Sequence, residues 1–426
     1  MKKLVYFLFG ISALVIFFGF NLSFPVVYAE TDDINITFIF ENKKFIYHSS
    51  NYESVNSFYF KSKLQNRFGF KDRAELLKDV LSLGIEPTKA LSYCLIGIDG
   101  VLNDMKEQIE CAPTDATYTF SDSYPHFTFT KEKVGLSLDF WLIANQIYDK
   151  LRFENNITIK LTPTRINPTV FYDDIKDYAN LKSEFSTSIM PNENRQHNIN
   201  LALSAFNKLV IEPDKEYSFN LITGQRSVSR GYKEAKIIVN GKYVDGTGGG
   251  VCQVSTTLYN ALLLAGVDIT EVHNHSLNSS YVKLGFDAMV NFGSADLKWR
   301  NNFDFPLFVL TNIVGNNIVV KIFGKNIHNV RYERVCEIEE TSPPPDDEIV
   351  VDSDGEYADL VQYNDESEYI QLPHTGYTVR AFLVKFENGN LVERKLLRRV
   401  RYHSCGGIKV VGTKERNNFD LSSNSY

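Results

Sequence analysis

The chain has 426 residues, of which 43% are hydrophobic and 23% are charged. This composition is typical of globular proteins and excludes a chain that is disordered throughout, and the length allows two or three domains. A formal net charge of -7 at pH 7 argues against a nucleic-acid-binding protein, which needs basic residues in excess to neutralise phosphates. Five cysteines is an odd number, so at least one thiol has no intramolecular disulfide partner.

The N-terminus has the pattern of an export signal. Lys2 and Lys3 precede an uncharged, largely apolar run from Leu4 to Phe20, and Ala29 follows as a suitable cleavage position. This pattern predicts a secretory signal peptide over residues 1–29. The run approaches the roughly 20 residues that span a bilayer, so an uncleaved membrane anchor is the alternative. Both interpretations predict an extracytoplasmic chain that is secreted or anchored in the membrane at the cell surface.

Residues 30–163 combine helix and strand patterns. Asn35 to Phe40 and Phe45 to Tyr47 predict a β-hairpin, and apolar spacing predicts helices over Ala74 to Leu83 and Leu138 to Leu151. A strand is expected over Ile157 to Leu161. We therefore expect a small N-terminal α+β module.

Residues 164–330 predict one well-defined helix among short strands. Gly248, Gly249 and Gly250 lead into a helix from Cys252 to Ala265, and Gly266 ends it. Strands are predicted over Val267 to Val272, Ala288 to Phe292, Leu307 to Thr311 and Ile318 to Phe323. We expect a central mixed α/β domain in which this helix packs on an antiparallel sheet.

The last part of the chain changes charge sign. From Glu337 to Glu368 there are thirteen acidic residues and no basic ones, with Pro343 to Pro345 inside, which predicts a solvated linker over 331–370. From Arg380 to Arg416 ten Lys or Arg face three Glu, on alternating patterns that predict a small β-rich C-terminal module over 371–416. The chain as a whole is predicted to be α+β. The basic strip is either a solvated sheet face or a surface that attracts an anionic wall polymer.

Export makes disulfides permissible. Cys94 and Cys111 lie close together in one region, and Cys336 and Cys405 bracket another, so these are the two expected pairs, and Cys252 is left as the unpaired thiol. The position of Cys252 is informative because a cysteine in the first turn of a helix lies at the positive end of the helix dipole, which favours the thiolate.

The segment before the predicted helix favours a nucleophilic role for Cys252. The glycines at 248, 249 and 250 would let a substrate backbone approach closely, and free amides of the first helical turn could stabilise an oxyanion. These three glycines and Gln253 are the predicted substrate-binding residues.

A thiol nucleophile needs a base and a group that orients the base. His273 and His275 follow the next predicted strand and share a face, and His275 is the preferred base. Asp287 is the first candidate for orienting the imidazole, and Asp296 is the second. The order of Cys, His and Asp resembles that of papain-like and transglutaminase-like thiol enzymes.

Three other interpretations of this segment stay open. Cys252 could be a small buried residue at a helix–sheet contact. Cys252, His273 and His275 could bind zinc, although no fourth ligand is evident. A phosphate-binding loop is disfavoured, because no Lys followed by Ser or Thr comes after the glycines. We expect no cofactor.

Several motifs together resemble the VanW family, which is named for an accessory gene of vancomycin-resistance clusters. The resemblance spans about Asp173 to Phe323, and its best-matching positions include the candidate residues above. The region 31–163 is similar to the peptidoglycan-binding module that often precedes a VanW domain, and the tail resembles a small β module of the G5 sort. The motifs are Arg195 to Asn200, Tyr217 to Asn220, Gly224 to Arg226, Gly231 to Ala235, Gly248 to Asn260, His273 to Ser276, Tyr281 to Val282, Gly285 to Ala288 and Asp296 to Leu297.

The resemblance implies a protein of the cell envelope of Gram-positive and related bacteria. Together with the candidate nucleophile, it predicts a protein that engages peptidoglycan and acts on its peptide stems by Cys-dependent acyl transfer or amide hydrolysis. The alternative is a non-catalytic cell-wall-binding or scaffold protein. The expected partner is peptidoglycan or another anionic wall polymer, and no nucleic acid.

Overall fold

The computed structural model describes residues 33–52, 69–239, 242–327 and 329–415. They form two compact units: the described residues up to Asp115 together with Glu132–Thr169, and Ala116–Lys131 together with the described residues from Val170 onward. The predicted signal or anchor over 1–29 lies outside the described residues. Among the described residues, no helix is both long enough and apolar enough to cross a membrane.

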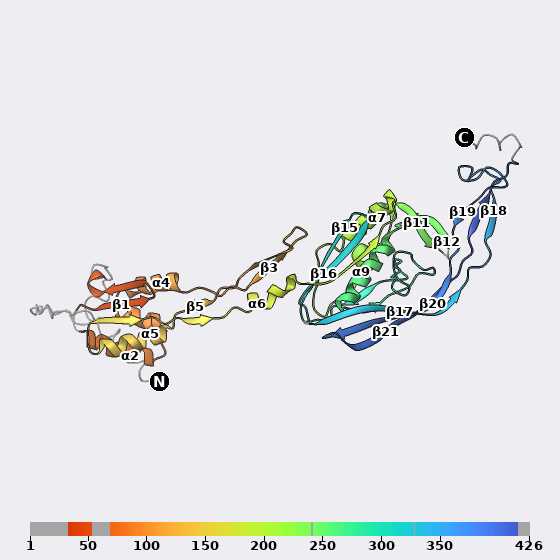
Figure 1. Cartoon of the computed structure of the whole chain (residues 1–426). Coiled ribbons are helices and arrows are strands. Elements are labelled where there is room, and N and C mark those ends of the chain that lie inside the picture. Colours follow the sequence, from red (N-terminus) through yellow and green to blue (C-terminus); the bar gives the residue numbers. More distant parts are fainter. Residues whose placement is uncertain (1–32, 53–68, 240–241, 328, 416–426) are drawn as a thin grey trace, which may run out of the picture. The chain divides into compact units, whose positions relative to one another are not determined.

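The first unit packs helices against a three-stranded sheet of order β2-β1-β6, in which β1 and β6 are parallel (Figure 1). Alternating buried residues Ile36 and Phe38 of β1 and Ile157 and Ile159 of β6 face the helices. The expected N-terminal hairpin, helices and strand are thus present. The elements are β1 (Asn35–Phe40), β2 (Lys43–His48), α2 (Phe70–Ser82), α3 (Pro87–Cys94), α4 (Ile98–Ile109), β5 (Gly135–Ser137), α5 (Phe140–Leu151), β6 (Asn156–Lys160) and β7 (Thr164–Ile166).

The second unit is built on an antiparallel sheet of order β8-β16-β15-β9. Helix α9 packs on β8 and β16, as the sequence predicts. The elements of this region are α6 (Tyr172–Ile175), β8 (Leu181–Ser188), α7 (Glu193–Ser204), β9 (Leu209–Ile211), β10 (Glu216–Ser218), α8 (Phe219–Thr223), β11 (Glu234–Val239), β12 (Lys242–Thr247), α9 (Val251–Ala265), β13 (Asp268–Glu271), β14 (Lys298–Arg300), β15 (Leu307–Val314) and β16 (Asn317–Phe323).

Both faces of this sheet are buried. Leu307 and Val309 of β15 belong to the core on the α9 side, whereas Phe308 and Leu310 face the hairpin of β3 (Thr117–Phe120) and β4 (Phe127–Thr130). This explains why β15 has a continuous apolar run instead of an alternating one. Because the aromatic residues of the hairpin pack on Phe308, the hairpin belongs to the second unit. The sequence pattern instead predicts that these residues belong to the N-terminal module over 30–163.

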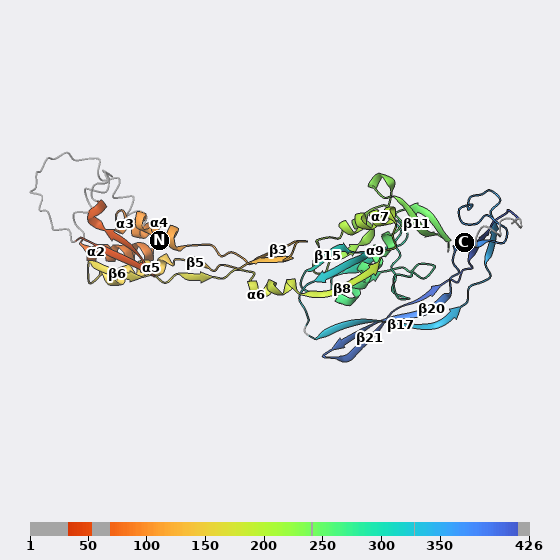
Figure 2. The same cartoon turned by 45° about the horizontal axis from the view of Figure 1, so that its top comes forward.

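The segment predicted as an acidic linker is largely β structure. Strand β17 pairs along its length with β20, and β20 pairs with β21, so these three strands run side by side in Figure 1 and in Figure 2. A second sheet has the order β18-β22-β19. The elements are β17 (Val330–Ser342), β18 (Glu348–Val351), β19 (Ser367–Gln371), β20 (Gly376–Glu387), β21 (Asn390–Tyr402) and β22 (Ile408–Val411).

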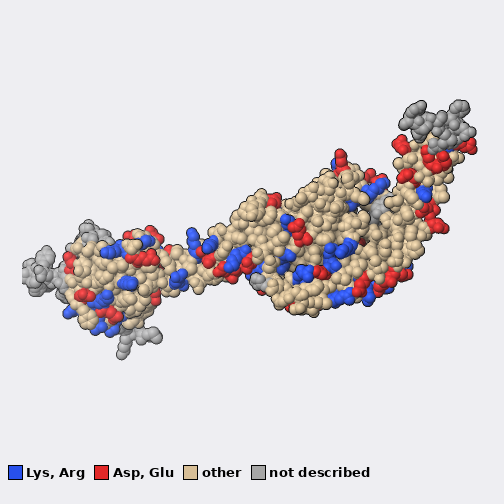
Figure 3. Space-filling model, in the orientation of Figure 1, with Lys and Arg blue, Asp and Glu red and all other residues tan. Residues whose placement is uncertain are grey.

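Ion pairs connect the acidic segment to the basic strands. Glu337 and Glu339 of β17 form ion pairs with Arg380 on β20 and with Arg394 and Arg399 on β21. Acidic and basic surfaces adjoin along this sheet in Figure 3. Two glutamates of the acidic stretch are therefore compensated by arginines of the basic strip across strands, which composition alone does not reveal.

The two disulfides favoured by sequence proximity are not formed. Among the described residues every cysteine is unbridged. Cys94 is buried in α3 while Cys111 is exposed, and Cys405 lies with its sulfur 3.1 Å from Nε2 of Gln371. Nearness in sequence did not bring the thiols of either predicted pair together.

Candidate functional site

The candidate nucleophile lies at the start of α9. Gly248 and Gly250 have φ angles of 89° and 106°, a region of backbone conformation that favours glycine, and Gly250 is the N-cap of the helix. Cys252 is the second helical residue and is partly exposed. Its sulfur therefore lies near the positive end of the α9 dipole.

The three glycines have a structural reason in this turn. A Cβ atom at Gly249 would lie 2.7 Å from the carbonyl oxygen of Lys236, and one at Gly250 would lie 2.9 Å from Cγ1 of Ile199. A Cβ at Gly248 would lie 2.9 Å from Cβ of Arg226. Close approach of the protein's own chain thus accounts for all three glycines, and their contact with a substrate stays a prediction.

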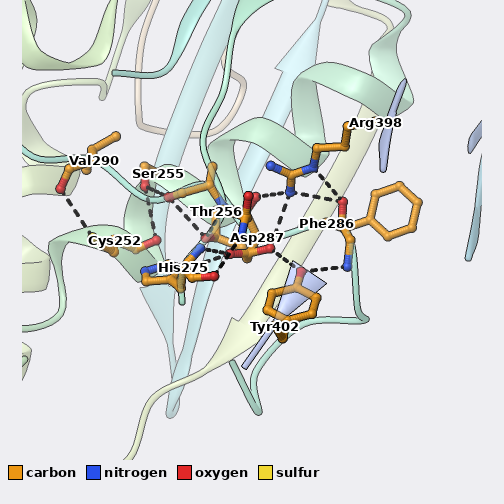
Figure 4. Close-up of polar contacts among 12 residues, drawn as sticks. Cys252, Ser255, Thr256, His275, Phe286, Asp287, Val290, Arg398 and Tyr402 are labelled. Atoms are coloured by element: carbon orange, nitrogen blue, oxygen red, sulfur yellow. Dashed lines mark hydrogen bonds and ion pairs between the residues drawn. The ribbon is translucent and has the colours of Figure 1, made fainter. Parts of the chain in front are cut away.

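Cys252, His275 and Asp287 form one array, in which His275 and Asp287 are hydrogen-bonded and Cys252 lies beside them (Figure 4). The side chain of Cys252 interacts electrostatically with that of His275, and its Sγ lies 3.4 Å from the carbonyl oxygen of Val290. Nδ1 of His275 lies 2.7 Å from Oδ2 of Asp287, which also accepts a 2.7 Å hydrogen bond from the backbone amide of His275. Asp287 therefore fixes the orientation of the ring and leaves Nε2 for the sulfur.

The pKa values of the three groups favour a charged state. Burial raises the pKa of the Cys252 thiol, but the hydrogen bond and charge of His275 outweigh it, and the pKa of the thiol is lowered. Burial lowers the pKa of His275, whereas hydrogen bonds with Asp287 and Cys252 raise it, to about 10. Burial also opposes ionisation of Asp287, yet His275 and Arg398 hold the pKa of its carboxyl below the usual range. These directions favour a thiolate at Cys252 beside a protonated His275 and an ionised Asp287.

The other two predicted members lie elsewhere. Nε2 of His273 is 2.9 Å from Oε1 of Glu271, so His273 belongs to a half-exposed ion pair. Asp296 accepts hydrogen bonds from the Ser218 hydroxyl and from the amide of Asn220, at 2.5 and 2.9 Å. Of the predicted alternatives, the structure thus joins His275 and Asp287 to Cys252.

Asp287 does not lie on a strand, and the strand predicted to follow it over 288–292 is not formed. Only isolated bridges form there, from His273 to Met289 and from Asn291 to Ala295. Polar side chains of α9 hold the segment instead. Ser255 donates to the carbonyl of Ala288, Thr256 accepts from the Ala288 amide, and Asn260 donates to the carbonyl of Phe286, at 2.5, 2.9 and 2.8 Å.

Gln253, which the sequence predicts to bind substrate, is hydrogen-bonded within the protein. Its side chain is buried, and Nε2 donates to Oγ1 of Thr187 and to the carbonyl of Ser188, at 3.1 and 2.8 Å. Its Oε1 accepts a 2.9 Å hydrogen bond from Arg195. Both amide hydrogens are therefore used within the protein.

Two residues that the sequence did not point to complete the array. The hydroxyl of Tyr402 donates a 2.5 Å hydrogen bond to Oδ1 of Asp287, and Nη2 of Arg398 lies 3.3 Å from the same oxygen. Arg398 also donates to the carbonyl of Gly285, and Tyr402 accepts from the Gly285 amide. Both residues are on β21, more than a hundred positions after Asp287, so no local pattern could have identified them.

The zinc alternative finds no support in the arrangement of side chains. Across the described ranges, no group of three or more His, Cys, Asp and Glu side chains is placed to hold a metal ion. His273 is engaged with Glu271 instead of with Cys252.

One family model and two curated relatives match part of this chain. Residues 194–323 match the family model described as "VanW like protein". "Uncharacterized protein YoaR" of Bacillus subtilis (strain 168) is 35% identical over 144 residues, which are 34% of this chain and 48% of that protein. "Vancomycin B-type resistance protein VanW" of Enterococcus faecalis (strain ATCC 700802 / V583) is 30% identical over 138 residues, which are 31% of this chain and 50% of that protein. The match thus spans about half the length of these curated relatives.

One solved structure, "Crystal structure of HP0197-G5", is 19% identical to this chain and covers 20% of it and 95% of its own chain, with a TM-score of 0.11. The family match, in contrast, includes every member of the array around Cys252 except the β21 residues. Residues 194–323 of this chain form a VanW-like domain.

Proposed function

We propose that this chain is a protein of the bacterial cell envelope whose VanW-like domain cleaves or transfers amide-linked acyl groups, with Cys252 as the nucleophile. The observation that carries the proposal is the hydrogen-bonded pair of His275 and Asp287 beside Cys252 at a helix start. A relative that carries the name of a vancomycin-resistance protein supports the envelope assignment. Peptide stems of peptidoglycan are the proposed substrate, because they are the amide-bearing component of the wall.

The first half of the reaction forms a thioester. The Cys252 thiolate attacks the carbonyl carbon of the amide, and the C–N bond breaks as Nε2 of His275 gives its proton to the departing amine. In the second half, water or an amine attacks the thioester carbon and gives a proton to His275, and the thiolate leaves. Water as acceptor gives hydrolysis, and an amine gives transfer.

The first turn of α9 offers a donor for the oxyanion. The amides of Val251 and Gln253 donate to the carbonyls of Gly248 and Gly250, whereas the amide of Cys252 has no acceptor within the described residues. This amide belongs to the nucleophilic residue itself. It would donate to the oxygen of the carbonyl group that Sγ attacks. Such a donor stabilises the tetrahedral intermediate more than the ground state.

Alkylation of the full chain tests the nucleophile. We expect iodoacetamide to modify Cys252 at pH 6 to 7 faster than a model thiol, because its pKa is lowered. The other cysteines provide an internal comparison, since burial raises the pKa of Cys94 to about 12 and also raises that of Cys336. A rate for Cys252 equal to that of a model thiol across this pH range rejects the proposal.

Purified sacculi separate the enzyme from a wall-binding scaffold. Wild type and Cys252→Ala are compared for sedimentation with sacculi and for release or exchange of stem-peptide fragments, followed by mass spectrometry. Unchanged sedimentation with products only from wild type supports the enzyme. Equal sedimentation with no products from either protein supports the scaffold.

A further inference from the structure

Arg226 is a partly buried cation that the array of Cys252, His275 and Asp287 does not use. Its Nη1 donates a 2.6 Å hydrogen bond to Oδ1 of Asn220, and its guanidinium lies 5.5 Å from the ring centroid of Phe219. The stem of the side chain passes Gly248, at the turn that leads into α9. The guanidinium is thus held from two sides.

Arg226 and Cys252 are attached to the same short segment. Sγ of Cys252 contacts the carbonyl oxygen of Val290, and the next carbonyl, that of Asn291, lies 3.4 Å from Nδ2 of Asn220. Asn220 in turn holds Arg226. Asn220 therefore links Arg226 to the segment that Cys252 contacts, and the charge of Arg226 contributes to the lowered pKa of Cys252, after burial, His275 and the Val290 carbonyl.

One nitrogen of this guanidinium has no hydrogen-bond acceptor within the described residues. Nη2 of Arg226 is buried and makes no hydrogen bond within the described residues. The nearby carboxylate of Asp296 does not take it, because Asp296 is engaged by Ser218, the Asn220 amide and the Leu297 amide. A buried donor without an acceptor is costly and rare in native proteins, so its retention beside a nucleophile indicates an acceptor that arrives with a ligand.

We propose that Arg226 binds a carboxylate of the substrate of Cys252, so that the preferred acyl donor is a peptide with a free carboxylate next to the amide that is attacked. This inference rests on the proposed function. Guanidinium is suited to the role because its planar set of donors matches a carboxylate. Binding of the carboxylate would satisfy Nη2 and would align the amide carbonyl with Sγ.

Two alkylating reagents that differ in charge test the inference on the full chain. Iodoacetate carries a carboxylate and iodoacetamide does not, and both react with the thiolate. A change in the thiolate fraction of Cys252 alters both rates equally, so the ratio of the two rates reports recognition of the carboxylate alone. We expect Arg226→Gln to lower this ratio roughly tenfold, which is the scale of losing a charge-assisted hydrogen bond.

Arg230→Gln is the matched control for charge. Arg230 is an exposed arginine four residues along the chain, and its Nη2 donates to the carbonyl of Thr223. We expect this variant to change the ratio less than twofold, since a long-range charge effect is weak next to a direct contact. Arg226→Lys keeps the charge but not the planar fork, and its ratio should lie between those of wild type and Arg226→Gln.

Protection of the wild-type protein provides a test without substitution. N-acetylalanine, which has a free carboxylate, should slow alkylation of Cys252 by iodoacetamide, and N-acetylalaninamide should not. If Cys252 reacts rapidly but Arg226→Gln and Arg230→Gln change the ratio equally, or both compounds protect alike, the carboxylate site is rejected while the nucleophile stands. If Cys252 is no faster than a model thiol, the proposed function itself fails.

Discussion

The hydroxyl of Tyr402 donates a 2.5 Å hydrogen bond to Oδ1 of Asp287, across 115 positions of sequence. Asp287 lies in the VanW-like domain, whereas Tyr402 is at the end of β21, beyond the family match. Ala381 of β20 is part of the same core as α9, so this sheet is packed against the domain. The candidate site is therefore completed by strands that follow the VanW-like domain in the chain.

Tyr402→Phe tests this support. Loss of the hydroxyl leaves Oδ1 of Asp287 with a weaker set of partners, and we expect the free energy of unfolding to fall by about 1–3 kcal/mol. The alkylation rate of Cys252 near neutral pH should fall as well, because Asp287 would hold His275 less firmly. Chemical denaturation and iodoacetamide kinetics measure the two effects.

Tyr377→Phe is the control for that substitution. Tyr377 lies opposite Tyr402 in the register of β20 and β21, and its hydroxyl makes no hydrogen bond within the described residues. We expect both measurements to stay close to wild type. Equal effects of the two substitutions would contradict a specific role for the Tyr402 hydroxyl.

Asp287→Asn should shift the pH dependence of alkylation. Asp287 raises the pKa of His275, and charged His275 lowers the pKa of Cys252. Without the carboxylate, His275 is neutral at a lower pH, so the onset of alkylation should move upward toward the pH of an ordinary thiol, whose pKa is about 8.5. Alkylation rates with iodoacetamide from pH 4 to 10 give the onset for wild type and for Asp287→Asn. An unchanged onset would contradict the proposed coupling of Asp287, His275 and Cys252.

The stability of the second unit should depend on pH through the same groups. The folded-state pKa of His275 is raised to about 10, so its stabilisation is fully present below the unfolded value of about 6.5 and is lost as the pH rises through 10. The pKa of Asp287 is lowered, so its contribution is present above the unfolded value and is lost as the pH falls. Up to about pH 8.5 the lowered pKa of Cys252 opposes this loss, so His275→Asn should flatten the decline of the unfolding midpoint above about pH 8.5, and a decline of wild-type size would argue against the linkage.

The charges of the C-terminal sheet give a prediction about wall binding. Arg380 and Arg399 are paired with Glu337 and Glu339, at 3.0–3.3 Å on β20 and 2.6 Å on β21, so their charges are compensated. Replacing both glutamates by glutamine frees the arginines, and we expect the double variant to be retained more strongly on sacculi or on an anionic column than wild type.

The effect should decrease as salt screens it. Because exposed ion pairs contribute little to folding, the unfolding midpoint should change only slightly. Glu340→Gln, on the same strand, is the control and should bind as wild type does, because the Glu340 carboxylate accepts from the Thr378 hydroxyl and forms no ion pair within the described residues. Equal retention of the double variant and wild type would show that this sheet face does not meet the polyanion.

Several elements were predictable because their own residues define them. The helix expected from Cys252 to Ala265 is α9, since three glycines, an apolar periodicity and Gly266 mark its limits locally. The strand expected from Ile318 to Phe323 is β16 for the same kind of reason. The strand expected over 288–292 did not form, because side chains of α9, not a neighbouring strand, satisfy the backbone there.

The sequence by itself determined that an unusual cysteine stands behind three glycines at a helix start, with two histidines and an aspartate soon after it. Only the tertiary structure decided that His275 and Asp287 join Cys252, that Arg398 and Tyr402 support Asp287, and that Arg226 keeps a donor without an acceptor. The physical reason is that helices and strands follow from local periodicity, whereas a hydrogen bond between distant side chains depends on how sheets and loops pack against each other.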